Sequence, residues 1–318
     1  MTGFDIGTRH VGDGAPALIV GEVAQAHEGS YQLAHAYVDA IADAGADAVK
    51  FQCHIAAAES WPDEPWRVKP RWGSETRYEY WKRMQFTPEQ WRELAEHAKS
   101  RGLAFIVSPF SVEAVEMVAP VVDAWKVASG EIGNEPMLRA IGRTETPVIV
   151  STGMTSWVEQ AQLIHVWEGL RKVGMARPER LFVGDEPPLW RRHREIAYLQ
   201  CTSQYPTPPE RVGLRQIAEL RAFFNRPVGL SDHSGTPYAG LAAVALGADI
   251  LEVHVKLSDY DPGPDASSSI TVAELRWLVH GARFIEAAKR PVDKDRMAEE
   301  LKDMRALFMG RHERRVAQ

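Results

Sequence analysis

Two histidines follow or end consecutive apolar runs in the last third of the chain: His233 in Gly229-Leu-Ser-Asp-His-Ser-Gly-Thr236 and His254 in Ile250-Leu-Glu-Val-His-Val-Lys-Leu257. Each run has the pattern of a buried strand that delivers its histidine at or near its carboxyl end. Imidazoles on neighbouring strands can converge on one point, which suits a divalent metal with open coordination positions. The sequence therefore predicts that His233 and His254 are metal ligands, with Mn²⁺ foremost and Mg²⁺, Co²⁺ or Zn²⁺ as alternatives.

The elements that would position these histidines follow a regular alternation. Short β-branched runs alternate with longer amphipathic segments, as in parallel strands joined by helices. Eight such units in roughly 270 residues predict an α/β fold of the (β/α)8 TIM barrel type. An open doubly wound sheet usually has fewer strands and a Gly-rich turn after the first, and this chain has no such turn. The expected strands are 17–24, 48–52, 104–109, 124–129, 147–152, 196–202, 227–232 and 250–257.

The domain organisation expected from this pattern is one barrel over residues 1–290 and a helical tail over 291–318, with one helix over 292–308. Two segments interrupt the alternation and are expected to be long loops: 56–85 after strand two and 176–194 before strand six. The first would lie on the face where barrel active sites are built, so it is a candidate lid. An alternative is that its tryptophans cover the barrel rim or an oligomer contact.

Polar side chains collect at the carboxyl ends of the expected strands, where barrel active sites lie. Lys50 and Lys126 with several hydroxyls describe a site for phosphate or carboxylate, because ammonium groups and convergent donors neutralise such oxygens. Glu22 and Glu131 stand beside the two histidines. A single Ser or Thr in such a place is more often a rim residue. The collected residues are Glu22, Gln25, His27, Lys50, Gln52, Ser108, Lys126, Ser129, Glu131, Ser151, Thr152, Thr202, Ser203, Tyr205, Ser231, Asp232, His233, Glu252, His254 and Lys256.

Composition narrows the class of partner. The chain has 318 residues and a formal net charge of -6, and it has no long basic block, so nucleic acid is not expected as a partner. Neither a signal peptide nor a membrane-spanning stretch is expected, which predicts a cytoplasmic protein. The two cysteines, Cys53 and Cys201, lie next to strand-like runs and argue against a disulfide framework. We expect small-molecule substrates and a homo-oligomer.

The motifs resemble those of the sialic acid (N-acetylneuraminate) synthases and their relatives that make other nonulosonic acids. The resemblance covers residues 18–269. It implies condensation of phosphoenolpyruvate with the open-chain aldehyde of an N-acylated hexosamine such as N-acetylmannosamine, with release of phosphate. The matching segments are Gly21-Glu-Val-Ala-Gln-Ala-His-Glu-Gly-Ser30, Gly45-Ala-Asp-Ala-Val-Lys-Phe-Gln52, Trp125-Lys-Val-Ala-Ser-Gly-Glu131, Val150-Ser-Thr-Gly-Met154, Gln200-Cys-Thr-Ser-Gln-Tyr-Pro-Thr-Pro208, Ser231-Asp-His-Ser234, Glu252-Val-His254 and Pro262-Gly-Pro-Asp265.

The resemblance also implies roles for individual residues. His233 and His254 look like the metal ligands, and Gln52, Tyr205 and Asp265 like contacts of the sugar. Glu22 and Glu131 match acidic positions near metal, water and phosphate, where a general acid or base would need a tuned pKa. The phosphoenolpyruvate cradle would consist of Lys50, Lys126, Ser129, Ser151, Ser203 and Ser231.

Three features depart from the family pattern. Ala26 precedes His27 where Asn is usual, and Ser203 stands where an Asn that contacts phosphate is common. The sequence also ends before the C-terminal antifreeze-like domain, which usually supplies an arginine that recognises the N-acyl group. We hypothesise that the insertion over 56–85 substitutes for that domain, with Arg67, Arg71 or Arg77 facing the sugar.

Two other functions stay open at this point. The first is condensation of phosphoenolpyruvate with a phosphorylated sugar, as in the 3-deoxy-octulosonate phosphate synthases, although no second phosphate pocket is evident. The second is a barrel without catalysis that serves as a binding or assembly subunit in polysaccharide biosynthesis. The retained histidines, glutamates and lysines argue against this second function, because an inactive scaffold has no physical need for a polar mouth.

Overall fold

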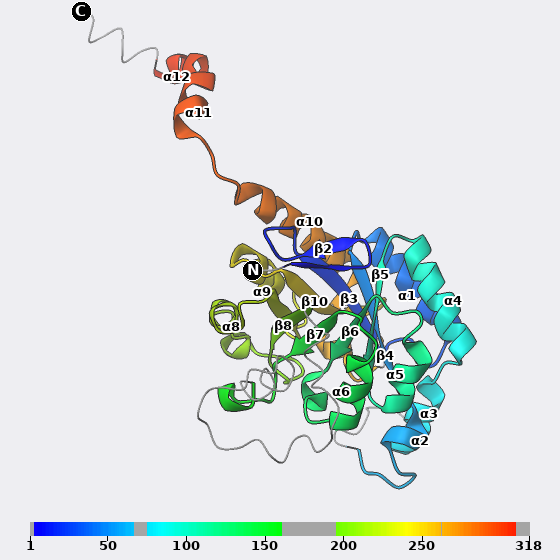
Figure 1. Ribbon diagram of the computed structural model, residues 1–318. Coiled ribbons are helices and arrows are strands. Elements are labelled where there is room, and N and C mark those ends of the chain that lie inside the picture. Colours follow the sequence, from blue (N-terminus) through cyan, green and yellow to red (C-terminus); the bar gives the residue numbers. More distant parts are fainter. Residues whose placement is uncertain (1–2, 67–74, 161–194, 262, 310–318) are drawn as a thin grey trace, which may run out of the picture.

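A closed barrel of eight parallel strands forms the centre of the computed structural model, which describes residues 3–66, 75–160, 195–261 and 263–309 (Figure 1). The strands follow chain order, and the last strand pairs with both its predecessor and the first strand, which closes the sheet. The predicted (β/α)8 barrel is confirmed, and each expected strand overlaps an observed one. The strands are β3 (Leu18–Ala24), β4 (Ala48–Cys53), β5 (Ala104–Pro109), β6 (Ala124–Val127), β7 (Val148–Ser151), β8 (Ile196–Cys201), β9 (Val228–Asp232) and β10 (Ile250–Lys256).

Helices cover the outside of the barrel and bury their apolar faces against the outward side chains of the strands. Local sequence sets their ends: α4, for example, starts with a capping box between Thr87 and Gln90, has Pro88 in its first turn, and is followed by Gly102 at φ +78°. The described helices around the barrel are α1 (Tyr31–Asp43), α4 (Pro88–Ser100), α5 (Val112–Val118), α6 (Glu135–Gly142), α8 (Gln216–Phe224), α9 (Tyr238–Ala245) and α10 (Val272–Ala288).

An N-terminal hairpin, which the sequence did not lead us to expect, closes the amino end of the barrel. Its strands β1 (Phe4–Ile6) and β2 (Arg9–Val11) pair antiparallel. Phe4, Ile6 and Val11 are buried in one cluster with residues that begin the barrel strands. With three residues each, these strands are too short to show a clear period in the sequence. The hairpin seals this end, so the opposite end of the barrel is the one available for substrates.

Three aspartates repeat one structural role at the amino end of the barrel. Each of them, Asp47, Asp123 and Asp249, directly precedes a barrel strand. Each accepts a hydrogen bond from a backbone N–H of the neighbouring strand. The donors are Ile19 N at 2.9 Å, Phe105 N at 2.8 Å and Val228 N at 2.9 Å, respectively. Each aspartate also pairs with a cation, which is Arg283, Lys99 or Arg221 in the same order. These contacts tie β3 to β4, β5 to β6 and β9 to β10 at the amino end of the barrel.

Replacing Asp249 by alanine should lower the free energy of unfolding by about 2 to 4 kcal/mol, because it leaves Val228 N and Arg221 without a buried carboxylate acceptor. Asp249→Asn should lose less, since an amide oxygen can still accept from Val228. Urea unfolding measures both values. Asp5→Ala is the control, because Asp5 is exposed and its contact with His10 lies at the surface. Equal losses in the Asp249 and Asp5 variants would contradict the assigned role.

The insertion after β4 is not a simple loop, so that expectation was wrong in its described part. It contains α2 (Ala56–Glu59) and α3 (Arg77–Met84), and α3 starts with a capping box between Thr76 and Glu79. Figure 1 places both helices near the carboxyl end of the barrel, away from the hairpin. The short length of each helix explains why 3.6-residue periodicity did not reveal it. The second expected insertion, 176–194, lies outside the described residues.

The tail after α10 also differs from the expected single helix. It forms α11 (Lys294–Glu300) and α12 (Lys302–Met309), which adjoin at Leu301, and Figure 1 shows them extending away from the barrel. The apolar spacing over 292–308 fits two short helices as well as one long helix, so the sequence did not distinguish them. Short elements complete the described structure: η1 (Ser129–Glu131), η3 (Pro209–Arg211), η4 (Ala266–Ser268) and β11 (Ile270–Thr271).

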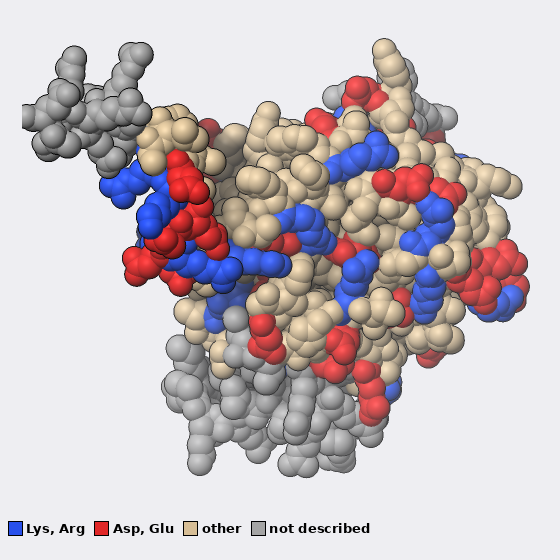
Figure 2. Space-filling model, turned by 90° about the horizontal axis from the view of Figure 1, so that it is seen from above, with Lys and Arg blue, Asp and Glu red and all other residues tan. Residues whose placement is uncertain are grey.

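The described surface is mixed in charge. On the face shown in Figure 2, basic and acidic side chains are interspersed and form no extended basic patch. None of the helices in the described ranges combines the length and apolar character needed to cross a bilayer. Cys53 and Cys201 are both free and buried, as expected from the sequence.

Candidate active site

Glu252 lies at the centre of a buried polar cluster near the carboxyl end of the barrel. Its Oε1 lies 3.2 Å from Lys126 Nζ and 3.5 Å from Lys50 Nζ, and it accepts a hydrogen bond from Ser231 Oγ at 3.0 Å. Strands β4, β6, β9 and β10 supply these four side chains, and all four are buried. The barrel therefore brings the two predicted anion-binding lysines to one point, with a carboxylate between them.

A second carboxylate, that of Glu22 on β3, also pairs with Lys50. Its Oε2 lies 2.8 Å from Lys50 Nζ, and its Oε1 accepts a hydrogen bond from Gln52 Nε2 at 3.2 Å. Lys50 also donates to Ser108 Oγ at 3.2 Å. The predicted catalytic residue Glu22 thus contacts one predicted phosphoenolpyruvate ligand and one predicted sugar ligand.

Burial and mutual charge determine how the cluster holds protons. Burial is the largest effect on Glu22 and raises its pKa to about 7, although the charge of Lys50 opposes it. Burial also acts to raise the pKa of Glu252, but Lys126 and Lys50 outweigh it and lower that pKa. For Lys50, the two carboxylates outweigh burial and raise the pKa, whereas burial lowers the pKa of Lys126. Glu22 is therefore the member suited to exchange a proton near neutral pH.

Three predicted hydroxyl ligands lie on the β6, β7 and β8 side of the barrel. Ser129 Oγ and Ser203 Oγ are 2.7 Å apart, and Ser151 Oγ is buried without a hydrogen-bond partner in the described structure. Gly153 lies against them, since a Cβ atom built there would come within 2.5 Å of Ser203 Oγ. A side chain at position 153 would therefore fill the space beside these hydroxyls, so a glycine keeps that space open.

The two predicted metal ligands also come together. The rings of His233 and His254 are 5.2 Å apart between centroids, and Tyr205 packs against His233 at 4.2 Å. His233 Nδ1 lies 3.1 Å from the carbonyl oxygen of Thr202, which leaves Nε2 for a ligand. His254 Nδ1 is buried without a hydrogen-bond partner, and Asp265 Oδ2 is 3.9 Å from it.

These histidines have the chemical properties of metal ligands. Burial lowers the pKa of His233 to about 4 and that of His254 well below its usual value, so both imidazoles are neutral at physiological pH. A neutral imidazole is the form that binds a divalent cation. Within the described ranges, no group of three or more His, Cys, Asp or Glu side chains is arranged around one point as a metal site. Among the described residues, a metal held by His233 and His254 would thus have coordination positions left for water or substrate.

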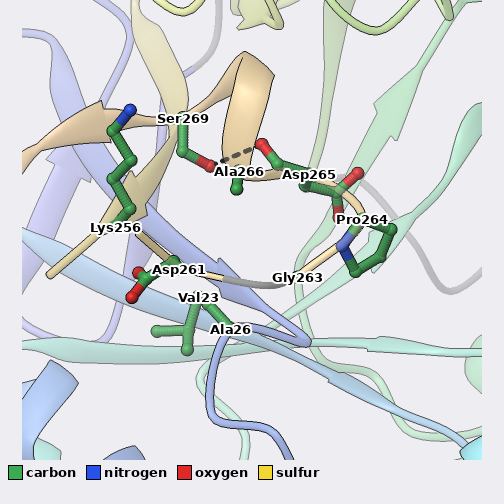
Figure 3. A pocket seen from close by; sticks show the side chains of 9 residues that line it. All are labelled: Val23, Ala26, Lys256, Asp261, Gly263, Pro264, Asp265, Ala266 and Ser269. Carbon is green, nitrogen blue, oxygen red and sulfur yellow. Dashed lines mark hydrogen bonds between the residues drawn. The ribbon is translucent and has the colours of Figure 1, made fainter. Parts of the chain in front are cut away.

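A small pocket of about 10 Å³, room for roughly one water molecule, lies between the segment after β3 and the segment after β10 (Figure 3). Ala26 lines it, so the residue that replaces the usual Asn leaves space rather than a hydrogen-bonding arm. Asp265, a predicted sugar ligand, lies across the pocket, and its carbonyl oxygen accepts from Ser269 Oγ at 2.8 Å. Burial raises the pKa of Asp265 to about 6.

Two predicted site residues have contacts that lead away from this cluster. Glu131 lies in η1, and its Oε2 accepts a hydrogen bond from Asn134 Nδ2 at 2.8 Å rather than from Lys50 or Lys126. The guanidinium of Arg77 is paired with Glu64, and its contact with a sugar stays a prediction. Arg67 and Arg71 lie outside the described residues.

Two residues that received no role from the sequence are central in the structure. Glu252 was noted among the polar strand ends but was given no role. It lies two residues before His254, so both side chains point to the same, inward face of β10. This spacing is the signal that could have assigned Glu252 to the site. His54, one residue after β4, gave no such signal, because its partners come from other segments.

His27 is buried between aromatic rings rather than exposed to the site. Its ring lies 4.7 Å from that of Phe86, and its Nδ1 accepts from Gly29 N at 3.1 Å. Burial lowers the pKa of His27 to about 3. An unfolded chain binds this proton at about pH 6.5. The stability due to neutral His27 is thus fully present above pH 6.5 and is lost as the pH falls toward about 3.

Between pH 7.5 and pH 5, the wild type should therefore lose about 2 kcal/mol more of its free energy of unfolding than His27→Gln does. Glutamine cannot take up the proton, so the difference between the two proteins isolates the contribution of this histidine. Urea unfolding at both pH values provides the measurement. If both proteins lose the same amount, the buried neutral state of His27 is refuted.

The fold and the buried cluster define the class: a (β/α)8 barrel whose carboxyl end carries paired lysines and carboxylates beside two neutral histidines. Residues 37–294 match the NeuB family, and the chain belongs to that family. It is 32% identical to the N,N'-diacetyllegionaminic acid synthase of Campylobacter jejuni over 275 residues, which cover 85% of this chain and 77% of that protein. It is also 32% identical to the human N-acetylneuraminate-9-phosphate synthase, covering 88% of this chain and 73% of that one.

A solved structure agrees with these relatives. The N-acetylneuraminic acid (sialic acid) synthetase of Leptospira borgpetersenii, crystallised with citrate, superposes with a TM-score of 0.76 at 25% identity. The match covers 96% of this chain and 97% of that one. The expected family resemblance is therefore confirmed.

Proposed function

We propose that this protein condenses phosphoenolpyruvate with the open-chain aldehyde of an N-acylated hexosamine to form a nonulosonic acid and phosphate. The observation that carries the proposal is the convergence of Lys50 and Lys126 on one buried point beside His233 and His254. Two ammonium groups at one end of a barrel suit a substrate that bears both a phosphate and a carboxylate. Membership of the NeuB family and the names of the relatives point to the same chemistry.

The reaction balances with one water molecule. A bond forms between C3 of the enol and the aldehyde carbon, the bond between C2 and the phosphate oxygen breaks, and the oxygen of water ends on C2. The attacking water gives up both of its protons: one ends on the new hydroxyl, and the other on the leaving phosphate as C2 becomes a ketone. Glu22, whose pKa is about 7, is placed to hold or release such a proton while it contacts Lys50 and Gln52.

The other site residues bind and orient the two substrates. Lys50 and Lys126 would neutralise the anionic groups of phosphoenolpyruvate, and the hydroxyls of Ser129, Ser151 and Ser203 would donate to them. Gln52, Tyr205 and Asp265 would face the sugar. We propose that His233 and His254 hold a divalent metal, with Mn²⁺ foremost, which would polarise the aldehyde when bound. Alignment of both substrates should contribute much of the rate enhancement.

The proposal is tested by measuring phosphate release from phosphoenolpyruvate with Mn²⁺ and a panel of acceptors. The panel contains N-acetylmannosamine, its 6-phosphate, 2,4-diacetamido hexoses, mannose, and phosphorylated tetroses and pentoses. We expect release with an N-acylated amino sugar, and the preferred one identifies the substrate. Release only with phosphorylated tetroses or pentoses would establish the alternative function. No release with any acceptor in the presence of metal would contradict the proposal and favour a barrel that only binds.

A further inference from the structure

His54 forms a link between the insertion and the active site. It follows β4 directly and is buried, although it is not part of the barrel wall. Its ring is stacked between two aromatic side chains: Trp81 of α3 at 3.7 Å between centroids and 13° between planes, and Phe110 after β5 at 4.0 Å and 18°. The two flat contacts hold the plane of the imidazole from both sides.

Both nitrogens of this ring have partners, which fix its rotation within that plane. Nδ1 lies 2.7 Å from Oε2 of Glu59 in α2, and Oε1 of the same carboxylate accepts from the backbone N–H of Ile55. Nε2 lies 3.2 Å from Oε1 of Gln52. The imidazole is therefore anchored by the insertion at one nitrogen and meets the predicted sugar ligand at the other.

The orientation of the Gln52 amide follows from its neighbours. Its Nε2 donates to Oε1 of Glu22 at 3.2 Å, so its oxygen must face the other way, where Gln25 Nε2 donates to it at 3.4 Å. His54 Nε2 lies 3.2 Å from the same oxygen. Because Nδ1 already donates to the carboxylate of Glu59, Nε2 donates to Gln52 in the doubly protonated ring, whose positive charge pairs with Glu59. A flipped amide would turn its oxygen toward the carboxylate of Glu22 and its N–H groups toward two donors. His54 thus disfavours the flipped amide through contacts that Glu22 alone does not supply.

We infer that His54 is a positioning residue that fixes the side-chain amide of Gln52, so that its N–H groups face Glu22 and the acceptor sugar. The effect on turnover rests on the proposed function, because only there does Gln52 meet a sugar. The effect on the amide itself does not depend on it. The insertion would then shape the acceptor site through the stacked imidazole.

Three substitutions separate hydrogen bonding from packing. His54→Phe keeps the stack and removes both nitrogens. His54→Gln can place an N–H where Nε2 stood, whereas the shorter amide of His54→Asn reaches only the position of Nδ1. If His54 positions Gln52, phosphate release should fall roughly 5- to 10-fold in kcat/KM for the sugar in the Phe and Asn variants, and less in the Gln variant. The KM for phosphoenolpyruvate should stay unchanged in all three. If His54 only fills space, Phe should be the best replacement and Gln and Asn the worst, which would overturn the inference.

A double-mutant cycle with Gln52→Ala tests whether the effect passes through Gln52. Once Gln52 is absent, His54→Phe should cost less than about 2-fold. A full 5- to 10-fold loss in the Gln52→Ala background would show that His54 acts by another route and would contradict the inference.

A measurement without turnover separates this inference from the proposed function. In protein labelled with ¹⁵N-glutamine, the side-chain signal of Gln52 is identified by its loss in Gln52→Ala. That signal should shift in His54→Phe and stay close to its wild-type position in His54→Gln. An unchanged signal in His54→Phe would refute the positioning role, whether or not the enzyme turns over. A shifted signal with no phosphate release from any acceptor would uphold the positioning role and reject the proposed function.

Discussion

Glu252→Ala should lower the free energy of unfolding by about 3 to 5 kcal/mol and leave little phosphate release, because it removes the carboxylate shared by two buried lysines. Lys50 retains Glu22, but Lys126 would lose its only carboxylate partner among the described residues. An unpaired buried ammonium is costly, so the pKa of Lys126, which burial already lowers, should fall further. Urea unfolding and phosphate release measure the two effects.

Phosphoenolpyruvate provides an internal check on this variant. An anion bound between the lysines would replace part of the lost negative charge, so it should raise the melting temperature of Glu252→Ala more than that of the wild type. Glu300→Ala serves as the control, because its pair with Arg296 lies on the exposed surface of α11 and should contribute less than about 1 kcal/mol. A Glu252→Ala protein as stable as this control would show that the cluster does not hold two charged lysines.

The second large effect is expected at the two histidines. His233→Ala and His254→Ala should each reduce metal-dependent phosphate release by about three orders of magnitude, since a metal that polarises a carbonyl contributes several kcal/mol to the transition state. Calorimetric titration with Mn²⁺ should show weakened binding in both variants, and dialysis against a chelator should inactivate the wild type until Mn²⁺ is restored.

Circular dichroism should show that both variants remain folded, because each substitution removes a neutral side chain at the open end of the barrel. His280→Ala is the matched control: His280 lies exposed on α10 and should bind metal and turn over as the wild type does. Normal activity in either His233→Ala or His254→Ala would reject the metal assignment.

Much of the site could be predicted because, in a barrel fold, the position of a residue within its strand decides at which end of the barrel it lies. A side chain at the carboxyl end of any strand lies at the same mouth, so recognising eight strands was sufficient to gather Lys50, Lys126, His233 and His254. The observed contacts agree with that expectation. Glu131 shows the limit of this expectation. It follows β6 at the same end of the barrel, yet the turn of η1 directs its carboxylate to Asn134.

The sequence by itself determined the order of strands and helices and the polar composition of the mouth, because hydrophobic period, caps and turn residues act within a few positions of one another. Only the tertiary structure decided which charges share a partner. Glu252 meets two lysines because β10 closes the barrel between β9 and β3, and His54 is held by α2, α3 and the residue after β5. Such contacts depend on distances between segments far apart in the chain, and ion pairs and stacked rings leave no periodic pattern in a sequence. For the same reason the pairing of Arg77 with Glu64 could be learned only from the folded chain.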